Sequence, residues 1–181
     1  SMEEMFSTAF FSTRKEQFYE FYRNEMLSQL ETPPGKGFIE MARLEKKGLF
    51  QSIITRRIFG LPERAGCTNV INLHGNVYDN FCPHCGRRYP MEYIRDSVRV
   101  PLCEDCKTPV RPRVCLFGEM VDNSVITRAA EEIQKADVLL VLGSNLKSYL
   151  CSQLIEYYEG DKLILVNETP HYADRFADIV V

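Results

Sequence analysis

The sequence has no long hydrophobic run, no surplus of positive charge and no recognisable leader. Its longest aliphatic stretch, Val138–Leu142, is far too short to span a bilayer, so we expect no membrane partner. The 22 Lys and Arg residues balance 25 Asp and Glu residues, and we therefore expect no nucleic-acid partner. The acidic start, Met2-Glu3-Glu4-Met5, lacks the basic and then apolar pattern of a secretory signal, which favours a cytoplasmic location.

Cysteine, in contrast, is well represented, with seven residues. Four of them form two Cys-x-x-Cys pairs, Cys82 with Cys85 and Cys103 with Cys106. Each pair can direct two thiolates at one ion, and two pairs complete the tetrahedron that zinc prefers. Two alternatives remain, a redox motif formed by the first pair alone and a disulfide framework, but neither accounts for the paired spacing in a chain without a secretory signal.

The residues around these cysteines indicate a small zinc-binding module over residues 79–109. The segment is polar and rich in turns, and a structural zinc site contributes about 10–16 kcal/mol of apparent folding free energy. Gly86, directly after Cys85, suits the turn that directs backbone amides at sulfur. Four cysteine ligands leave no position for catalytic water, so we predict a structural ion. The other three cysteines are predicted to be small core residues: Cys67, Cys115 and Cys151.

Helix and strand patterns flank the predicted module. Thr13–Glu16 reads as a capping box, followed by a helix with Phe18, Tyr22, Met26 and Leu30 on one face. A second helix over residues 38–47 and a buried strand over residues 50–54 are predicted next.

From Asp122 onward, helices alternate with short aliphatic strands. Asp122 is predicted to cap a helix, and strands are predicted at Val138–Leu142, at residues 163–166 and at residues 179–181, with another helix over residues 150–158. Continuous aliphatic strands that alternate with helices are typical of a parallel sheet covered on both faces, which places the chain in the α/β class.

Five ordered segments resemble the sirtuin family of NAD-dependent protein deacylases. They include the aromatic helix start at residues 18–22 and the Leu73-His74-Gly75 end of the stretch over residues 65–75. The remaining three are the Arg-Pro-x-Val-x-x-Phe-Gly-Glu segment at residues 111–119, the Gly-Ser-Asn-Leu turn at residues 143–146 and Val166-Asn167. The four cysteines follow at the family's spacing.

This resemblance implies a Rossmann-like parallel sheet over residues 2–78 and 110–181, interrupted by the zinc module. It implies His74 as the catalytic base, an acylated-lysine protein as the partner and NAD as the cofactor. The resemblance places NAD-binding at Thr55, Gly143, Ser144, Asn145 and Asn167. It places the acyl-lysine channel at Val114, Leu116, Phe117, Gly118 and Glu119.

The sequence departs from the family pattern in two places that bear on function. The family's Gly-Ala-Gly-x-Ser turn and Pro-Asp-Phe-Arg loop have no counterpart, so we expect a sheet that is incomplete at its N-terminal part. Its exposed edges are expected to be covered by self-association or by another chain. The family's Thr-Gln-Asn-Ile-Asp motif is here Thr55-Arg56-Arg57-Ile58-Phe59.

The changed motif brings positive charge to a reaction whose transition state is itself positive. One charge about 4 Å away costs about 1 kcal/mol in water and about 4 kcal/mol at an effective dielectric of 20. Each 1.36 kcal/mol is about tenfold in rate, so one arginine could cost up to about a thousandfold. We therefore expect an impaired or inactive deacylase. The alternative is a non-catalytic sirtuin-like protein that self-associates or binds ADP-ribose-like ligands through its arginines.

Overall fold

A computed structural model describes residues 1–144, 146–170 and 172–181. The chain divides into two compact units, an N-terminal unit of Ser1–Val121 and a C-terminal unit of Asp122–Val181. None of the helices in the described residues is both long and apolar enough to cross a membrane.

The N-terminal unit begins with short helices around an aromatic core. These are α1 (Met2–Met5), α2 (Thr8–Thr13) and α3 (Lys15–Phe21), continued by a π-helical turn at Tyr22–Met26 and a 3-10 turn at Leu27–Glu31. Phe18 is fully buried, with its ring centroid 6.4 Å from that of Phe6 and 5.7 Å from that of Tyr22. The predicted helical face is therefore confirmed.

The predicted capping box at Thr13 is wrong. Thr13 lies at the end of α2, where its hydroxyl donates to the Ala9 carbonyl, and α3 begins without a side-chain cap. The hydroxyl is already satisfied inside the preceding helix, a local competition that the four-residue pattern does not show.

A two-stranded parallel sheet follows. Helix α4 (Lys36–Lys46) precedes β1 (Ile53–Thr55), which pairs with β2 (Val70–Asn72), and α5 (Leu61–Arg64) lies between the two strands in sequence. The strand predicted over residues 50–54 is present but begins and ends later. Because Thr55 is opposite Asn72, the residues that follow both strands leave the sheet at the same edge.

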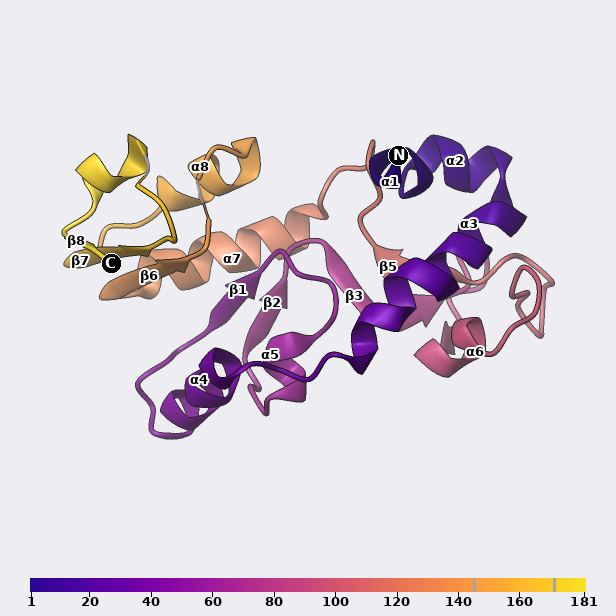
Figure 1. The fold of residues 1–181 in the computed structure, drawn as a ribbon, viewed down its shortest axis with the longest axis horizontal. Coiled ribbons are helices and arrows are strands. Elements are labelled where there is room, and N and C mark those ends of the chain that lie inside the picture. Colours follow the sequence, from indigo (N-terminus) through magenta and orange to yellow (C-terminus); the bar gives the residue numbers. More distant parts are fainter. Residues whose placement is uncertain (145, 171) are drawn as a thin grey trace. The chain divides into compact units, whose positions relative to one another are not determined.

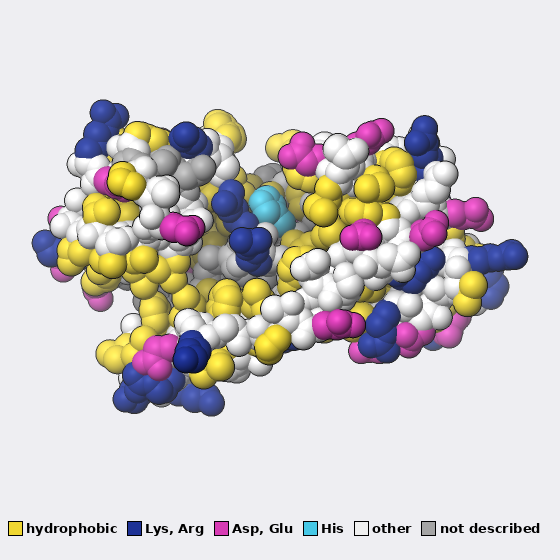
Figure 2. Space-filling view, viewed as in Figure 1, with side chains coloured by type: hydrophobic (Ala, Val, Ile, Leu, Met, Phe, Trp, Pro, Cys, Tyr) yellow, Lys and Arg dark blue, Asp and Glu magenta, His cyan; other side chains and the backbone are white. Residues whose placement is uncertain are grey.

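An antiparallel sheet carries the cysteine pairs (Figure 1). Strand β3 (Gly75–Phe81) lies between β4 (Arg88–Tyr89) and β5 (Arg111–Val114), with α6 (Met91–Arg95) following β4. Figure 2 shows basic and acidic side chains interspersed over the part of the unit that carries α6, in keeping with the balanced composition.

The C-terminal unit contains the alternating elements that the sequence predicts. They are α7 (Asn123–Lys135), β6 (Val138–Leu142), α8 (Tyr149–Ile155), β7 (Lys162–Val166), a 3-10 turn at Tyr172–Phe176 and β8 (Ile179–Val180). Asp122 caps α7, accepting the Ser124 amide at 2.7 Å. The three strands are parallel in the order β6-β7-β8, and Leu163 and Leu165 lie in their core. The α/β class is confirmed.

Candidate functional site

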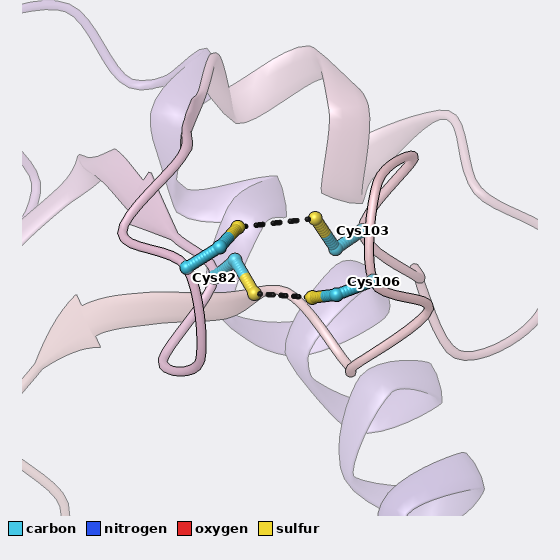
Figure 3. A group of neighbouring side chains, drawn as sticks. Cys82, Cys103 and Cys106 are labelled. Carbon is cyan, nitrogen blue, oxygen red and sulfur yellow. Dashed lines mark hydrogen bonds between the residues drawn. The ribbon is translucent and has the colours of Figure 1, made fainter.

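The four predicted metal ligands converge on one point. Their sulfur atoms all lie within 4.8 Å of one another, with Sγ separations of 3.3 Å between Cys82 and Cys106 and 3.6 Å between Cys85 and Cys103. Figure 3 shows the labelled Cys82, Cys103 and Cys106 with their sulfurs directed inward. Because all four are free cysteines, the disulfide alternative has no support.

The two pairs adopt the same backbone turn. Gly86 N–H donates to the Cys82 carbonyl at 2.9 Å, and Lys107 N–H donates to the Cys103 carbonyl at 3.0 Å. Both donors have a left-handed backbone, with φ of 77° at Gly86 and 60° at Lys107. This conformation, which costs a non-glycine residue some strain, is repeated at the same position after each pair.

Hydrogen bonds to sulfur favour the thiolate form of Cys103. The Tyr89 hydroxyl donates to Cys103 Sγ at 3.1 Å and accepts the Glu104 amide at 2.9 Å. The backbone N–H of Cys106 and the Tyr89 hydroxyl lower the pKa of the Cys103 thiol to about 6.

This donor set fits a structural zinc ion. With Zn–S bonds of about 2.3 Å, a tetrahedral ion holds its sulfurs about 3.8 Å apart, close to the separations between the facing cysteines. Cys82, Cys85, Cys103 and Cys106 would fill all four positions, so the ion would hold the two turns together rather than activate water.

His74, the predicted base, lies at the junction of two strands. It separates β2 from β3, and its carbonyl accepts the Cys115 amide at 2.8 Å. The following Gly75 has φ of 79°, and a Cβ on it would lie 1.9 Å from the Arg113 carbonyl oxygen. Only glycine lets β3 approach β5 this closely, and this approach fixes the backbone beside the imidazole.

The imidazole of His74 is half-buried and has an unused polar atom. Its Nδ1 is buried and finds no hydrogen-bond partner among the described residues. Burial lowers the pKa of His74 below its usual 6.5, and the nearby charge of Arg56 lowers it further. The side chain is therefore neutral at pH 7, which is the form that accepts a proton.

The substituted motif, residues 55–59, begins at the end of β1 and lies beside His74. Thr55 is half-buried, its hydroxyl accepts the Arg57 amide at 3.0 Å, and its carbonyl accepts the Leu73 amide at 2.9 Å. Arg56 and Arg57 are exposed and form no ion pair with any described residue. Phe59 is half-buried against the aromatic core and offers no polar atom.

The predicted acyl-lysine segment divides into core and surface. Val114 and Leu116 are buried, whereas Phe117 is 54% exposed. Both backbone groups of Phe117 are already paired, because its N–H donates to Phe6 and its carbonyl accepts from Thr8 at 3.0 Å. Glu119 is fixed by Arg111 and accepts the Leu116 amide at 2.9 Å, whereas the Gly118 backbone forms no hydrogen bond with any described residue.

Four predicted cofactor residues lie in the C-terminal unit, and the three that the structure describes follow the carboxyl ends of parallel strands. Gly143 follows β6, and its N–H donates to the Val166 carbonyl at 2.9 Å. Asn167 follows β7, and its Nδ2 is buried without a hydrogen-bond partner among the described residues. Ser144 follows Gly143 and its hydroxyl accepts the Leu146 amide at 3.4 Å. Asn145 lies outside the described residues.

Sequence reasoning missed several polar residues around both sites. Tyr89, Lys107 and Arg87 shape the cysteine cluster. Only the turn at Lys107 could have been inferred from the sequence, because Lys107 follows the second cysteine pair as Gly86 follows the first. Two residues before His74 in the sequence, Asn72 Nδ2 donates to Glu63 at 2.6 Å, while Asn72 Oδ1 and Glu63 Oε2 are buried without partners among the described residues. Cys67 is buried as predicted, and Cys115 and Cys151 are half-buried.

Comparison with known proteins places this arrangement in a family context. The family model described as "Sir2 family" matches residues 1–149. The NAD-dependent protein deacetylase of Clostridium acetobutylicum is 37% identical over 180 residues, covering 99% of this chain and 73% of the relative. The NAD-dependent protein deacetylase of Thermotoga maritima is 36% identical over 175 residues, covering 93% and 71%.

Solved structures agree in fold as well as in sequence. The structure described as "Sir2-p53 peptide-NAD+" aligns with a TM-score of 0.86 at 35% identity, covering 97% of this chain and 75% of that one. Another, described as "The Structural basis of Sirtuin Substrate Affinity", aligns with a TM-score of 0.91 at 34% identity, covering 98% and 75%. The chain therefore belongs to the Sir2 family, the sirtuins.

Proposed function

We propose that this chain carries the chemistry of an NAD-dependent protein-lysine deacylase, with His74 as the general base. The observation that carries the proposal is the half-buried His74 with a pKa below 6.5 and a free Nδ1 atom, beside the segment Val114–Glu119. Relatives at 36–37% identity are NAD-dependent protein deacetylases, and similar Sir2 chains have been solved with acetylated or propionylated peptides.

Bound NAD would supply an ADP-ribosyl group to the acyl oxygen of the substrate lysine. The role of His74 is to accept a proton from a ribose hydroxyl, which requires a neutral imidazole. Its lowered pKa keeps it neutral at pH 7. Gly118, whose backbone has no partner among the described residues, would hold the substrate peptide, and Thr55, Gly143, Ser144, Asn145 and Asn167 would hold the cofactor.

We infer that this activity is weaker than that of relatives with the family motif. Arg56 already acts electrostatically on His74, so it lies near enough to oppose positive charge that develops on the ribose. Phe59 accepts no hydrogen bond where the family has an aspartate. These two changes reduce stabilisation of the transition state without removing the base.

A second candidate is a non-catalytic protein that binds ADP-ribose-like ligands. The exposed Arg56 and Arg57, which form no ion pair with any described residue, favour it, because guanidinium groups suit phosphate. On this reading His74 contributes to the shape of the site and moves no proton.

Two measurements on the zinc-loaded chain separate the candidates. The first is nicotinamide release from NAD with an acetyl-lysine peptide, for the wild type, His74→Ala and the exposed control His84→Ala. The deacylase proposal expects slow release that His74→Ala abolishes and His84→Ala leaves unchanged. The second is calorimetry with ADP-ribose: binding without release supports the second candidate, whereas neither binding nor release contradicts both.

We also propose that residues 79–109 form the zinc module inserted into a Rossmann-like domain of residues 2–78 and 110–181.

In the C-terminal unit, β6 pairs with β7 on one side only among the described residues, and its Val138 and Leu142 are 50% and 45% exposed. An all-aliphatic edge strand without charges invites pairing, so we propose self-association through β6. Light scattering tests it: Leu142→Lys should dissociate an oligomer, and a wild-type monomer contradicts the idea.

A further inference from the structure

Arg87 connects the two cysteine turns. It follows Gly86 at the end of the first turn, and its guanidinium reaches across to the second. It forms ion pairs with Glu104 and with Asp105, the latter at 2.7 Å. Glu104 and Asp105 are the two residues between Cys103 and Cys106. The Arg87 side chain, from the first turn, therefore binds both residues that separate the two ligands of the second turn.

The same guanidinium lies over an aromatic ring that contacts sulfur. The centre of the Arg87 guanidinium is 5.4 Å from the Tyr89 ring centroid. Tyr89 is buried, and its hydroxyl bonds both Cys103 Sγ and the Glu104 amide. Arg87, Tyr89, Glu104 and Asp105, here called the Arg87 network, therefore join the backbone of both turns to one of the ligand atoms.

The Arg87 network offsets electrostatic repulsion at the metal site. Four thiolates around a divalent ion carry a net charge of −2, and the carboxylates of Glu104 and Asp105 add negative charge beside them. Unopposed, these carboxylates and the metal site with its net negative charge would repel each other. Arg87 offsets this repulsion with a planar fork that bonds two carboxylates at once.

We propose that the Arg87 network positions the second cysteine pair and slows loss of the metal ion. Each ion pair alone is half-exposed, with 43% of the Arg87 side chain accessible, and an isolated pair of this kind contributes little to stability. The effect of the network is to hold the second turn against the first. Cys85, the exposed ligand, leaves a chelator a route to the ion that this closure must oppose.

The test is the rate of zinc release from the full zinc-loaded chain to excess chelator, in Arg87→Gln against Arg88→Gln. Arg88 is the neighbouring arginine, but it pairs with Asp79 outside the network, so it controls for loss of a surface charge. Arg87→Gln should release zinc about tenfold faster or more, the usual range for residues that support metal ligands. Arg88→Gln should release it at the wild-type rate, and Arg87→Lys should fall between.

Ionic strength and cobalt spectra distinguish positioning from general loosening of the fold. In 1 M salt the Debye length falls to about 3 Å, so the wild-type rate should approach that of Arg87→Gln. Tyr89→Phe should stay faster than wild type in high salt, because it loses a hydrogen bond to sulfur rather than a charge. With Co²⁺, Arg87→Gln should keep the tetrahedral absorption, whereas Tyr89→Phe should shift the sulfur-to-cobalt band.

Equal release from Arg87→Gln and Arg88→Gln would overturn the proposal, as would a wild-type rate indifferent to salt. If Arg87→Gln does not accumulate as folded protein, the double variant Glu104→Gln with Asp105→Asn removes the same ion pairs from the other side. It should release zinc faster than Arg88→Gln, and an equal rate contradicts the proposal. The assay uses no NAD, so its outcome is independent of the proposed activity.

Discussion

The cysteine cluster and the surroundings of His74 belong to the same unit but differ in how their polar groups are satisfied. Around the cysteines, backbone N–H groups, Tyr89 and Thr108 all contact sulfur or the two turns. At His74, the imidazole Nδ1 is buried and has no hydrogen-bond partner among the described residues. A buried atom without a partner is costly, so this Nδ1 favours a site arranged for a bound molecule.

Removing the metal is expected to have the largest effect, because the cysteine cluster should lose its folded structure. The four-cysteine module is polar and rich in turns, and a structural zinc ion contributes about 10–16 kcal/mol of apparent folding free energy. Chelation of zinc should therefore abolish ordered amide NMR signals over residues 79–109. Cys106→Ser should weaken zinc binding, whereas Cys151→Ser, outside the cluster, should not. Unchanged spectra after complete zinc removal would contradict a metal-dependent module.

Gly75→Ala should cause the next largest loss of stability. A Cβ there would meet the Arg113 carbonyl oxygen at 1.9 Å, and the positive φ adds strain. We expect a loss of about 3 kcal/mol or more in the free energy of unfolding, measured by urea denaturation. Gly37→Ala is the matched control: it lies in helix α4 with nothing within 4 Å, so it should stabilise by about 0.5–1 kcal/mol. Equal effects of the two would exclude the close approach of β3 to β5.

Arg56→Gln should change the titration of His74 without unfolding the chain. Removing the positive charge raises the pKa of His74, although burial keeps it below 6.5. The folded state holds this histidine neutral, so its contribution favours folding at high pH and is lost as pH falls through the unfolded value of about 6.5. NMR titration of the His74 ring protons measures the shift. Arg43→Gln is the control. An unchanged His74 pKa in Arg56→Gln would show that Arg56 does not act on His74.

The smallest effect concerns the loop that leads into β2. The Glu45 carboxylate accepts the amides of Asn69 and Thr68, each at 2.8 Å, and these bonds lower the pKa of Glu45 below 4.5. Its stabilisation is therefore present above pH 4.5 and is lost as pH falls through the folded value. Glu45→Gln should cost about 0.5–1 kcal/mol at pH 7 and almost nothing at pH 3, by urea denaturation. Glu131→Gln, an exposed helical control, should show no such difference between the two pH values.

These two regions also differ in how far the sequence predicts them. The spacing of Cys82, Cys85, Cys103 and Cys106 is enough to predict the metal cluster, because each pair closes its own local turn. Strands β6 and β7 were likewise predictable from continuous aliphatic residues. The Thr13 cap failed because a neighbouring helix already used the hydroxyl, and the contacts of Arg87 and Tyr89 required the tertiary fold. The role of His74 came from family resemblance, since an isolated histidine carries no pattern of its own.

The central claim is that His74 is the base of a deacylase slowed by the substituted motif. It is tested most directly by nicotinamide release from NAD and an acetyl-lysine peptide, using zinc-loaded chain with Arg56→Gln, Arg57→Asn and Phe59→Asp combined. The account predicts at least about tenfold faster release than wild type, since each 1.36 kcal/mol of relieved repulsion is about tenfold. Adding His74→Ala to that variant should abolish the release. Release that stays at the wild-type rate in the combined variant, or that persists without His74, would contradict the claim.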